Sequence, residues 1–205
     1  MKHQAGPLFD VPRETLDRLD LFVSILLRWN GKLNLVSARS ADDAWRRHIA
    51  DSLQLLPLLP SAPEALLDIG SGAGFPGMVL AAATGWEVDL VEVDKRKAAF
   101  LVEAASRLGL SRVKVHAVRI EDAQVPPAKL LTARALAPLP KLLRYAHAAL
   151  SPDGTALFPK GRTAEQELTA ASRDWSMRVE RFPSRTDPAS TIFRISEIRP
   201  AGSEA

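Results

Sequence analysis

The feature that most constrains this fold is a glycine-rich segment over residues 68–77, which joins an apolar run to a helical stretch. It reads Asp68-Ile69-Gly70-Ser71-Gly72-Ala73-Gly74-Phe75-Pro76-Gly77. Glycines let a backbone turn tightly, and they let a ligand lie against the main chain without meeting a Cβ atom. A loop of this kind between a strand and a helix is typical of α/β folds that bind a nucleotide-type cofactor. The segment therefore predicts a cofactor site at the end of a strand.

The chain around this loop alternates short apolar runs with helical stretches. The predicted strands lie at 65–69, 88–93, 113–118, 130–133 and 156–158, and the predicted helices lie near 77–84, 95–108, 138–150 and 163–173. Strands that are apolar on both faces and separated by helices indicate a parallel sheet covered on both sides. Two further strands, near 178–182 and 191–198, have no helix between them and predict a terminal antiparallel hairpin. We therefore expect an α/β, Rossmann-like fold with a mostly parallel seven-stranded sheet.

The first 60 residues carry a purely helical pattern. Residues 13–30 have apolar side chains at helical spacing, and Asn30-Gly31 is a typical helix stop. Ser40 has the character of an N-cap for a second helix, which we expect to run to about Leu56. The sequence thus predicts an N-terminal helical cap over 1–60 on a domain over 61–205, the two forming one structural unit.

Missing residue types exclude several classes of protein. The 205 residues contain no cysteine, which excludes disulfides, thiolate metal sites and cysteine nucleophiles. The four histidines are scattered without ligand spacing, so we expect no metal. No apolar run reaches the roughly 18–20 residues that cross a bilayer, and the N-terminal segment lacks the apolar core of a signal peptide. We therefore expect a soluble, cytoplasmic protein without membrane contact.

Acidic residues near the loop decide between two cofactor classes. Gly72, Gly74 and Gly77 satisfy the dinucleotide pattern G-x-G-x-x-G, which alone is weak. Asp68 would repel a pyrophosphate, but it can meet the amino-acid ammonium of S-adenosylmethionine, directly or through water. Glu92 closes the next strand, where a carboxylate can accept both ribose hydroxyls of either cofactor. We therefore expect S-adenosyl-L-methionine rather than NAD, with a ligand-free tight turn as the third interpretation.

Chemistry narrows the methyl acceptor. Without cysteine, the covalent route to C5 of a pyrimidine is excluded, and no Asn-Pro-Pro-aromatic tetrapeptide supports methylation of an exocyclic amine. Guanine N7 already offers a lone pair and needs only positioning and in-line approach. Residues 111–150 hold seven basic side chains against two acidic ones, a net +5, although the whole chain carries only +3. Such a segment is either a solvated face or a surface for an anionic partner.

The sequence closely resembles the glucose-inhibited division protein B family over about residues 15–198. The resemblance is carried by Trp29-Asn30, Asn34-Leu35, Ser37, Arg47-His48-Ile49-Ala50-Asp51-Ser52, the glycine-rich segment, Arg134-Ala135 and Lys160-Gly161. It implies a class I S-adenosylmethionine-dependent methyltransferase fold with an N-terminal helical cap. It also implies methylation of guanine N7 in 16S ribosomal RNA of the small ribosomal subunit. The cofactor contacts that it implies are Gly70, Phe75, Glu92, Ile120, Glu121 and Arg134.

The candidate site residues form three groups. The expected cofactor-binding residues are Asp68, Gly70, Gly72, Gly74, Phe75, Glu92, Ile120, Glu121 and Arg134. The expected catalytic residues, which position the reactants without a general base, are His48, Arg134 and Lys160. The expected RNA contacts are Asn34, Arg39, Arg46, Arg47, Asp51 and Ser52. Other interpretations stay open: His48, Asp51 and Ser52 share one helix face and could form a structural polar cluster, and Asn34 could be a turn residue.

The leading hypothesis is a monomeric enzyme that methylates guanine N7 in 16S ribosomal RNA. One alternative is an NAD-dependent oxidoreductase built on the same loop, but Ala149 stands four residues after Tyr145, so the catalytic Tyr-x-x-x-Lys pair is missing. The other alternative is an RNA-binding module without catalysis. Intact acidic and basic residues at Asp68, Glu92 and Arg134 argue against that module.

Overall fold

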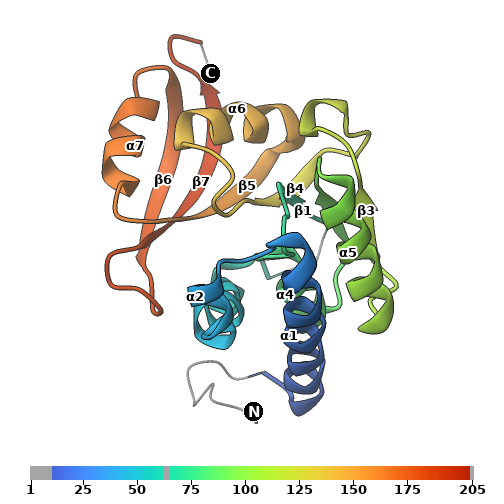
Figure 1. Cartoon of the computed structure of the whole chain (residues 1–205). Coiled ribbons are helices and arrows are strands. Elements are labelled where there is room, and N and C mark those ends of the chain that lie inside the picture. The colour runs from blue at the N-terminus through green and yellow to red at the C-terminus, as the bar shows by residue number, and fades with distance from the viewer. Residues whose placement is uncertain (1–10, 62–64, 204–205) are drawn as a thin grey trace.

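The computed structural model describes residues 11–61 and 65–203, and its strands form one mixed sheet (Figure 1). In chain order the strands are β1 (Leu66–Ile69), β2 (Val88–Val91), β3 (Val113–His116), β4 (Ala128–Thr132), β5 (Leu150–Lys160), β6 (Trp175–Pro183) and β7 (Thr191–Pro200). Their order across the sheet is β3-β2-β1-β4-β5-β7-β6. The first five pair in parallel, and β7 pairs antiparallel with both β5 and β6. The predicted seven-stranded, mostly parallel sheet with a terminal hairpin is confirmed.

Helices cover both faces of the sheet. They are α4 (Gly77–Thr84) and α5 (Lys95–Arg107) with α1 (Arg13–Leu33) on one face, and α6 (Leu139–Ala149) and α7 (Ala164–Ala171) on the other. Figure 1 shows α6 at the top, α7 at the left beside β6, and α1 and α4 in the lower part of the molecule. Successive residues of β1 point to opposite faces. Leu66 therefore packs in the apolar cluster formed with α1, α4 and α5, and Leu67 packs in the cluster formed with α6 and α7. Burial on both faces explains why the strands are continuous apolar runs.

Strand β5 begins earlier than its sequence predicts. We expected only 156–158, because Pro152, Asp153 and Gly154 interrupt the apolar pattern. The sheet accommodates these residues through a register shift opposite Ala128 and Leu130 of β4. A Cβ atom at residue 154 would lie 2.9 Å from the Ala128 carbonyl oxygen, so glycine is required where the two backbones approach closely.

Helix α1 does not end where the sequence predicts. It runs through Asn30-Gly31 to Leu33, and Asn34 ends it in the left-handed conformation with φ of 48°. The Asn34 N–H donates to the Asn30 carbonyl at 3.1 Å, and the Asn30 side chain accepts from the Val36 N–H at 2.8 Å. The predicted stop at Gly31 is wrong because Asn34, not Gly31, makes the turn that closes the helix.

The second helix of the cap is broken into short pieces. These are α2 (Ala38–Ala41), the π-helical η1 (Trp45–Ala50), α3 (Asp51–Leu53) and the 3₁₀ turn η2 (Leu56–Leu58). The N-cap is Ser37, which accepts from the Ser40 N–H, so the prediction of one helix capped by Ser40 is wrong. A π-helical turn holds more residues than an α-helical turn and is frequent at functional sites.

The cap and the sheet domain share one apolar core. The Phe22 ring of α1 lies 5.4 Å from the Phe75 ring and 6.2 Å from the Phe100 ring of α5. The predicted boundary at 60–61 lies beside residues 62–64, which are outside the described residues. Over residues 11–61 and 65–203, the structure contains no helix with the length and apolar character needed to span a membrane.

Candidate functional site

The glycine-rich segment forms the turn between β1 and α4. Gly70, Gly72 and Gly74 have φ values of 65°, 53° and 86°, which residues with a Cβ atom rarely adopt. At Gly77 an added Cβ atom would lie 2.7 Å from the Asp68 Cβ, so this glycine lets α4 pack against β1. At Gly72 an added Cβ atom would meet nothing closer than the Gly70 carbonyl oxygen at 3.7 Å. Gly72 therefore leaves an open main-chain surface for a ligand.

A cavity of about 760 Å³, here called the large cavity, opens beside this turn at the C-terminal ends of the parallel strands. Ligands of open α/β sheets bind at this edge. The lining residues are Leu35, Val36, Ser37, Ser40, Arg47, His48, Gly70, Ser71, Gly72, Ala73, Phe75, Val91, Glu92, Val93, Lys97, Val118, Arg119, Ile120, Glu121, Arg134, Ala135, Leu136, Lys141 and Tyr145. Of the predicted cofactor residues, only Asp68 and Gly74 are absent from this lining.

Glu92 has the geometry of a hydroxyl acceptor. The residue is 6% exposed and lines the large cavity. Its Oε2 accepts from the Gly72 N–H at 2.8 Å, and its Oε1 accepts from the Asp94 N–H at 2.8 Å. Each carboxylate oxygen keeps a further lone pair, so the group is fixed in place and can still accept from a ligand. This arrangement fits the two hydroxyls of a ribose.

Asp68 lies beneath the turn, not in the cavity. The residue is 1% exposed, and its Oδ1 accepts from the Thr132 hydroxyl at 2.6 Å. No described residue makes a hydrogen bond of ordinary geometry to Oδ2. Burial raises the pKa of Asp68 to about 6, against the lowering effect of the Thr132 hydroxyl. The position favours a supporting role under the glycine turn, and the direct contact with a cofactor ammonium stays a prediction.

Arg134 joins the end of β4 to the cap. Its Nη1 donates to Asp51 Oδ2 at 3.0 Å and to the Arg47 carbonyl at 3.1 Å, and its Nη2 lies 2.9 Å from His48 Nδ1. The guanidinium carbon lies 5.0 Å from the centre of the Phe75 ring, and the His48 ring stacks on Phe75 at 4.7 Å. The structure thus brings together five predicted site residues from three separate segments of the sequence.

These contacts define the protonation state of His48. Because an arginine can only donate, His48 Nδ1 accepts from Arg134 and the proton of the neutral ring sits on Nε2. Burial, followed by the neighbouring Arg134 cation, lowers the pKa of His48 to about 4. His48 is therefore neutral at physiological pH. With Nδ1 occupied, it suits a positioning role and not that of a general base.

Lys160 lies at the end of β5 and is held by two partners. Its side chain is 9% exposed, and its Nζ lies 2.7 Å from Glu167 Oε2 and donates to the Ala137 carbonyl at 3.0 Å. The preceding residue, Pro159, is still part of β5 and is paired with Ile192 of β7. Lys160 does not line the large cavity but lines a smaller one beside it, so its catalytic role stays a prediction.

The predicted RNA contacts divide into exposed and occupied residues. Arg39, Arg46 and Arg47 are exposed on the cap, although Arg46 Nε pairs with Asp43 Oδ2 at 2.8 Å. Asp51 is paired with Arg134. Ser52 of α3 is 1% exposed and donates to the His48 carbonyl at 2.7 Å, so this placement gives its predicted RNA contact no support. Asn34 is exposed and makes the turn that ends α1.

The structure adds cavity residues that the sequence did not indicate. Val93, Val118 and Leu136 are large apolar side chains that stay exposed at the mouth, Val93 to 58%. Apolar residues placed directly after strand ends are the signal that could have found Val93 and Val118. Tyr145 also lines the cavity, but it lies within the apolar pattern of α6 and carries no such signal.

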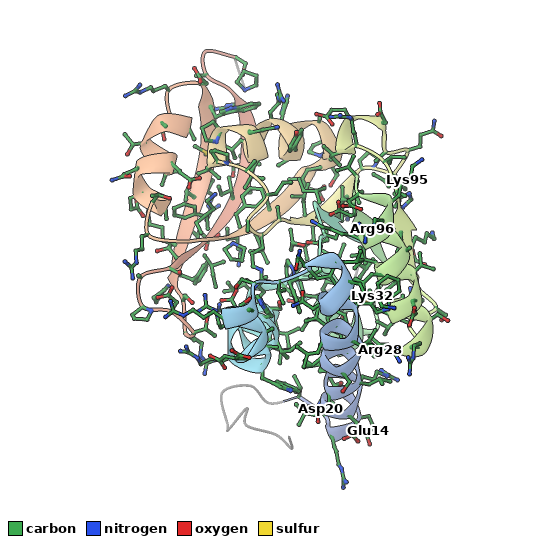
Figure 2. All side chains as sticks on the ribbon, viewed as in Figure 1. Glu14, Asp20, Arg28, Lys32, Lys95 and Arg96 are labelled. Carbon is green, nitrogen blue, oxygen red and sulfur yellow. The ribbon has the colours of Figure 1, made fainter. Side chains whose placement is uncertain are left out.

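A basic group lies outside the cavity where α1 meets α5. Figure 2 shows Arg28 and Lys32 on α1 beside Lys95 and Arg96 of α5. Arg96 Nη2 donates to the Lys32 carbonyl at 3.2 Å, which links the two helix ends, and Arg28 pairs with Glu103 at 3.2 Å. This group extends the positive charge beyond the 111–150 segment that the sequence singled out.

Comparison with known proteins identifies similar sequences along nearly the whole chain. Residues 15–189 match the family GidB, described as rRNA small subunit methyltransferase G. A ribosomal RNA small subunit methyltransferase G from Rhodospirillum centenum is 55% identical over 194 residues, covering 95% of this chain and 89% of that protein. The protein of the same name from Granulibacter bethesdensis is 58% identical over 188 residues, covering 92% of this chain and 88% of its own length.

Solved structures share the fold at low sequence identity. A SAM dependent methyltransferase from Aquifex aeolicus superposes with a TM-score of 0.59 at 14% identity, covering 84% of this chain and 97% of that one. MtNAS in complex with S-adenosylmethionine gives a TM-score of 0.60 at 17% identity, covering 89% and 77%. These matches confirm the predicted class I methyltransferase fold.

Proposed function

Because this chain belongs to the rRNA small subunit methyltransferase G family, we propose that it transfers a methyl group from S-adenosylmethionine to N7 of a guanine in 16S ribosomal RNA. It is an S-adenosylmethionine-dependent methyltransferase, as its relatives are. The observation that carries the proposal is the Glu92 carboxylate, fixed by the Gly72 N–H at the edge of a 760 Å³ cavity whose other wall holds Arg134.

The residues of the large cavity fit the cofactor. Gly72 offers an open main-chain surface, and Glu92 keeps free lone pairs for the ribose hydroxyls. Ile120 and Glu121 line the cavity after β3, where they would flank the adenine ring of the cofactor. When bound, S-adenosylmethionine supplies an electrophilic methyl group on a positively charged sulfur.

The protein contributes positioning, because guanine N7 needs no base to attack a methyl group. The N7 lone pair forms the new bond while the electron pair of the broken bond stays on sulfur, and no proton moves at N7. Phe75, His48 and Arg134 form a rigid cluster beside the glycine turn, with His48 neutral and its Nδ1 occupied. Such preorganisation holds the reacting atoms at attack distance and supplies much of the rate enhancement.

The exposed arginines of the cap supply the RNA contacts in this proposal. Arg47 is exposed and lines the cavity, and Arg39 is exposed next to Ser40, which lines it too; such cations can pair with phosphates and fix the register of the RNA. The target guanine must be unpaired or flipped out to reach the cavity. We place the reaction in the cytoplasm, where small subunits are assembled, and we take the acting species to be a monomer. The NAD-dependent oxidoreductase and the non-catalytic RNA-binding module are not favoured by the family membership.

The direct test is methyl transfer to small ribosomal subunits that lack the modification. The wild-type protein and a Glu92→Gln variant are incubated with labelled S-adenosylmethionine and these subunits, and the labelled base is mapped. Label at guanine N7 with the wild type, and much less with the variant, supports the proposal. Absence of transfer by a folded wild type, together with clear binding of NADH, would overturn it.

A further inference from the structure

A second cavity, of about 230 Å³ and here called the small cavity, adjoins the large one. The two linings have only Arg134 and Ala135 in common. Ala135 has a φ of 55°, a conformation that residues other than glycine adopt rarely and that is found often at functional sites. In a methyl transfer the two ligands react at one bond, so the spaces that hold them must open to each other, and residues that line both cavities mark where they adjoin. The wall formed by Arg134 and Ala135 is such a place.

The small cavity is built by parts of the chain that are far apart in sequence. The cap contributes Asp51 and Gln54, strand β5 contributes its end at Lys160-Gly161, and the connection between β6 and β7 contributes Ser184 and Ser190. It therefore exists only when the cap, the sheet and the terminal hairpin are all in place.

A single buried amide fixes the hairpin connection to the cap. Gln54 is 3% exposed, and its Oε1 accepts from the Arg185 N–H at 2.8 Å and from the Ser184 hydroxyl at 3.3 Å. Its Nε2 donates to Asp51 Oδ1 at 2.7 Å, and the Thr186 hydroxyl donates to the same oxygen at 2.6 Å. These paired groups make the wall rigid before any ligand enters, which is the condition for a preorganised subsite.

The chemistry of the wall suits a nucleobase better than a phosphate. The carboxylates of Asp51 and Glu167 are paired with the cations of Arg134 and Lys160, so the lining is polar but close to neutral. A phosphate would find both cations of this lining already paired with carboxylates. A guanine presents acceptors on its N7 and O6 edge and an amino donor on the opposite side, and a mixed lining can match both. The volume is below the roughly 300–1,000 Å³ of whole-ligand sites, as a single base requires.

Two cations stand near the β6–β7 connection that contributes to the small cavity, where they can hold the flanking RNA backbone. The carboxylate of Asp187, on the β6–β7 connection, has its pKa lowered first by the Ala189 N–H and the Ser190 hydroxyl, and further by the cations of Arg162 and Arg47. Arg47 and Arg162 are exposed and stand on the cap and after β5. Phosphates on either side of a flipped base would meet these arginines.

We propose that the small cavity receives the target guanine, flipped out of its RNA, with N7 facing the large cavity at the junction lined by Arg134 and Ala135. This inference rests on the proposed function and names the acceptor subsite for it. Asp51 and Gln54 act as positioning residues, because they hold the hairpin connection that closes the subsite.

Gly161→Leu tests the subsite by filling it. Gly161 lines the small cavity, an added Cβ atom there meets nothing within 4 Å, and its φ lies outside the left-handed region. Gly31→Leu is the matched control, because Gly31 has the same open surroundings but lies on α1 away from both cavities. Ser190→Leu enters from the opposite wall and decides the question if Gly161→Leu does not fold.

Four measurements separate the outcomes: thermal unfolding, S-adenosylmethionine affinity by calorimetry, RNA affinity by filter binding, and steady-state methylation of unmodified small subunits. A blocked base subsite lowers kcat/KM by about 100-fold, while cofactor affinity stays unchanged and RNA affinity falls little, since the phosphate contacts remain. If Gly161→Leu or Ser190→Leu folds and methylates small subunits as fast as the control Gly31→Leu, the small cavity is not the guanine subsite. Absence of methylation by the wild type overturns the proposed function instead.

Discussion

Replacing Asp68 with asparagine tests whether the protein keeps a costly charge beneath its glycine turn. Asp68 is buried, and burial raises its pKa to about 6 from an ordinary value of 3.8. One pKa unit corresponds to about 1.36 kcal/mol, so ionised Asp68 costs the folded state about 3 kcal/mol at neutral pH. Between these two pKa values the unfolded chain has released its proton while the folded chain keeps it. The contribution of Asp68 to the free energy of unfolding therefore falls as pH rises from about 4 to 6, and is level above that.

The Asp68→Asn variant removes the charge and keeps the shape. Its carbonyl oxygen can still accept from the Thr132 hydroxyl, which lies 2.6 Å from Oδ1 in the wild type. Its amide nitrogen replaces Oδ2, and an unpaired buried amide costs about 1–3 kcal/mol. Because that cost is the same at every pH, the pH-dependent part of the difference between the two proteins isolates the charge. The variant should gain about 3 kcal/mol relative to the wild type between pH 4 and pH 8.

Urea unfolding of both proteins without cofactor, at each pH from 4 to 8, measures this difference. His48 also titrates in this range, but both proteins carry it, so its contribution cancels. A difference that stays constant with pH would refute the reasoning. Calorimetry of Asp68→Asn also distinguishes support of the glycine turn from direct contact with the cofactor ammonium. If Asp68 only supports the turn, cofactor affinity stays nearly unchanged. A loss of tenfold or more would indicate the direct ammonium contact.

Three further predictions concern single side chains. Glu92→Gln should weaken S-adenosylmethionine binding about tenfold to a hundredfold in calorimetry, since charge-assisted hydrogen bonds contribute roughly 1.5–3 kcal/mol, and unchanged affinity would exclude the ribose contact. His48 is neutral when folded and its pKa is lowered to about 4, so its own contribution to stability should fall as pH drops from 6.5 towards 4, opposite in sign to that of Asp68. His48→Phe should lose less stability on acidification in urea titrations; an equal loss would assign the effect elsewhere. Arg39→Ala should reduce the slope of log affinity for RNA against log salt by roughly 0.7–0.9, whereas Arg178→Ala on the edge strand β6 should not.

The sheet and its helices were predictable because their signals are local. Strands buried on both faces read as apolar runs, and α4 occupies the predicted residues 77–84. The cap was less predictable. Its second helix breaks around a π-helical turn, and the Arg134 side chain that contacts Arg47 and His48 there comes from more than eighty residues later in the chain. The sequence pattern of residues 40–56 alone therefore could not predict the contact with Arg134.

The site was predictable where a residue's role depends on its own strand end. Glu92 and Arg134 line the large cavity as expected. Asp68 follows the same rule in sequence, but close packing of Gly77 against its Cβ places its side chain under the turn. The hydrogen bonds of Gln54 to the 184–186 segment span about 130 residues, so no local pattern pointed to the small cavity.

The strand order has a consequence for how the protein is made. Strand β7 is the last to be synthesised, yet it lies between β5 and β6 in the finished sheet. Until residues 191–200 emerge from the ribosome, β5 keeps an unpaired edge and β6 has no neighbour to join. Unpaired edges are templates for pairing with other chains. A message that stops before Thr191 would therefore yield an aggregating fragment, and a nascent chain depends on protection until its final strand arrives.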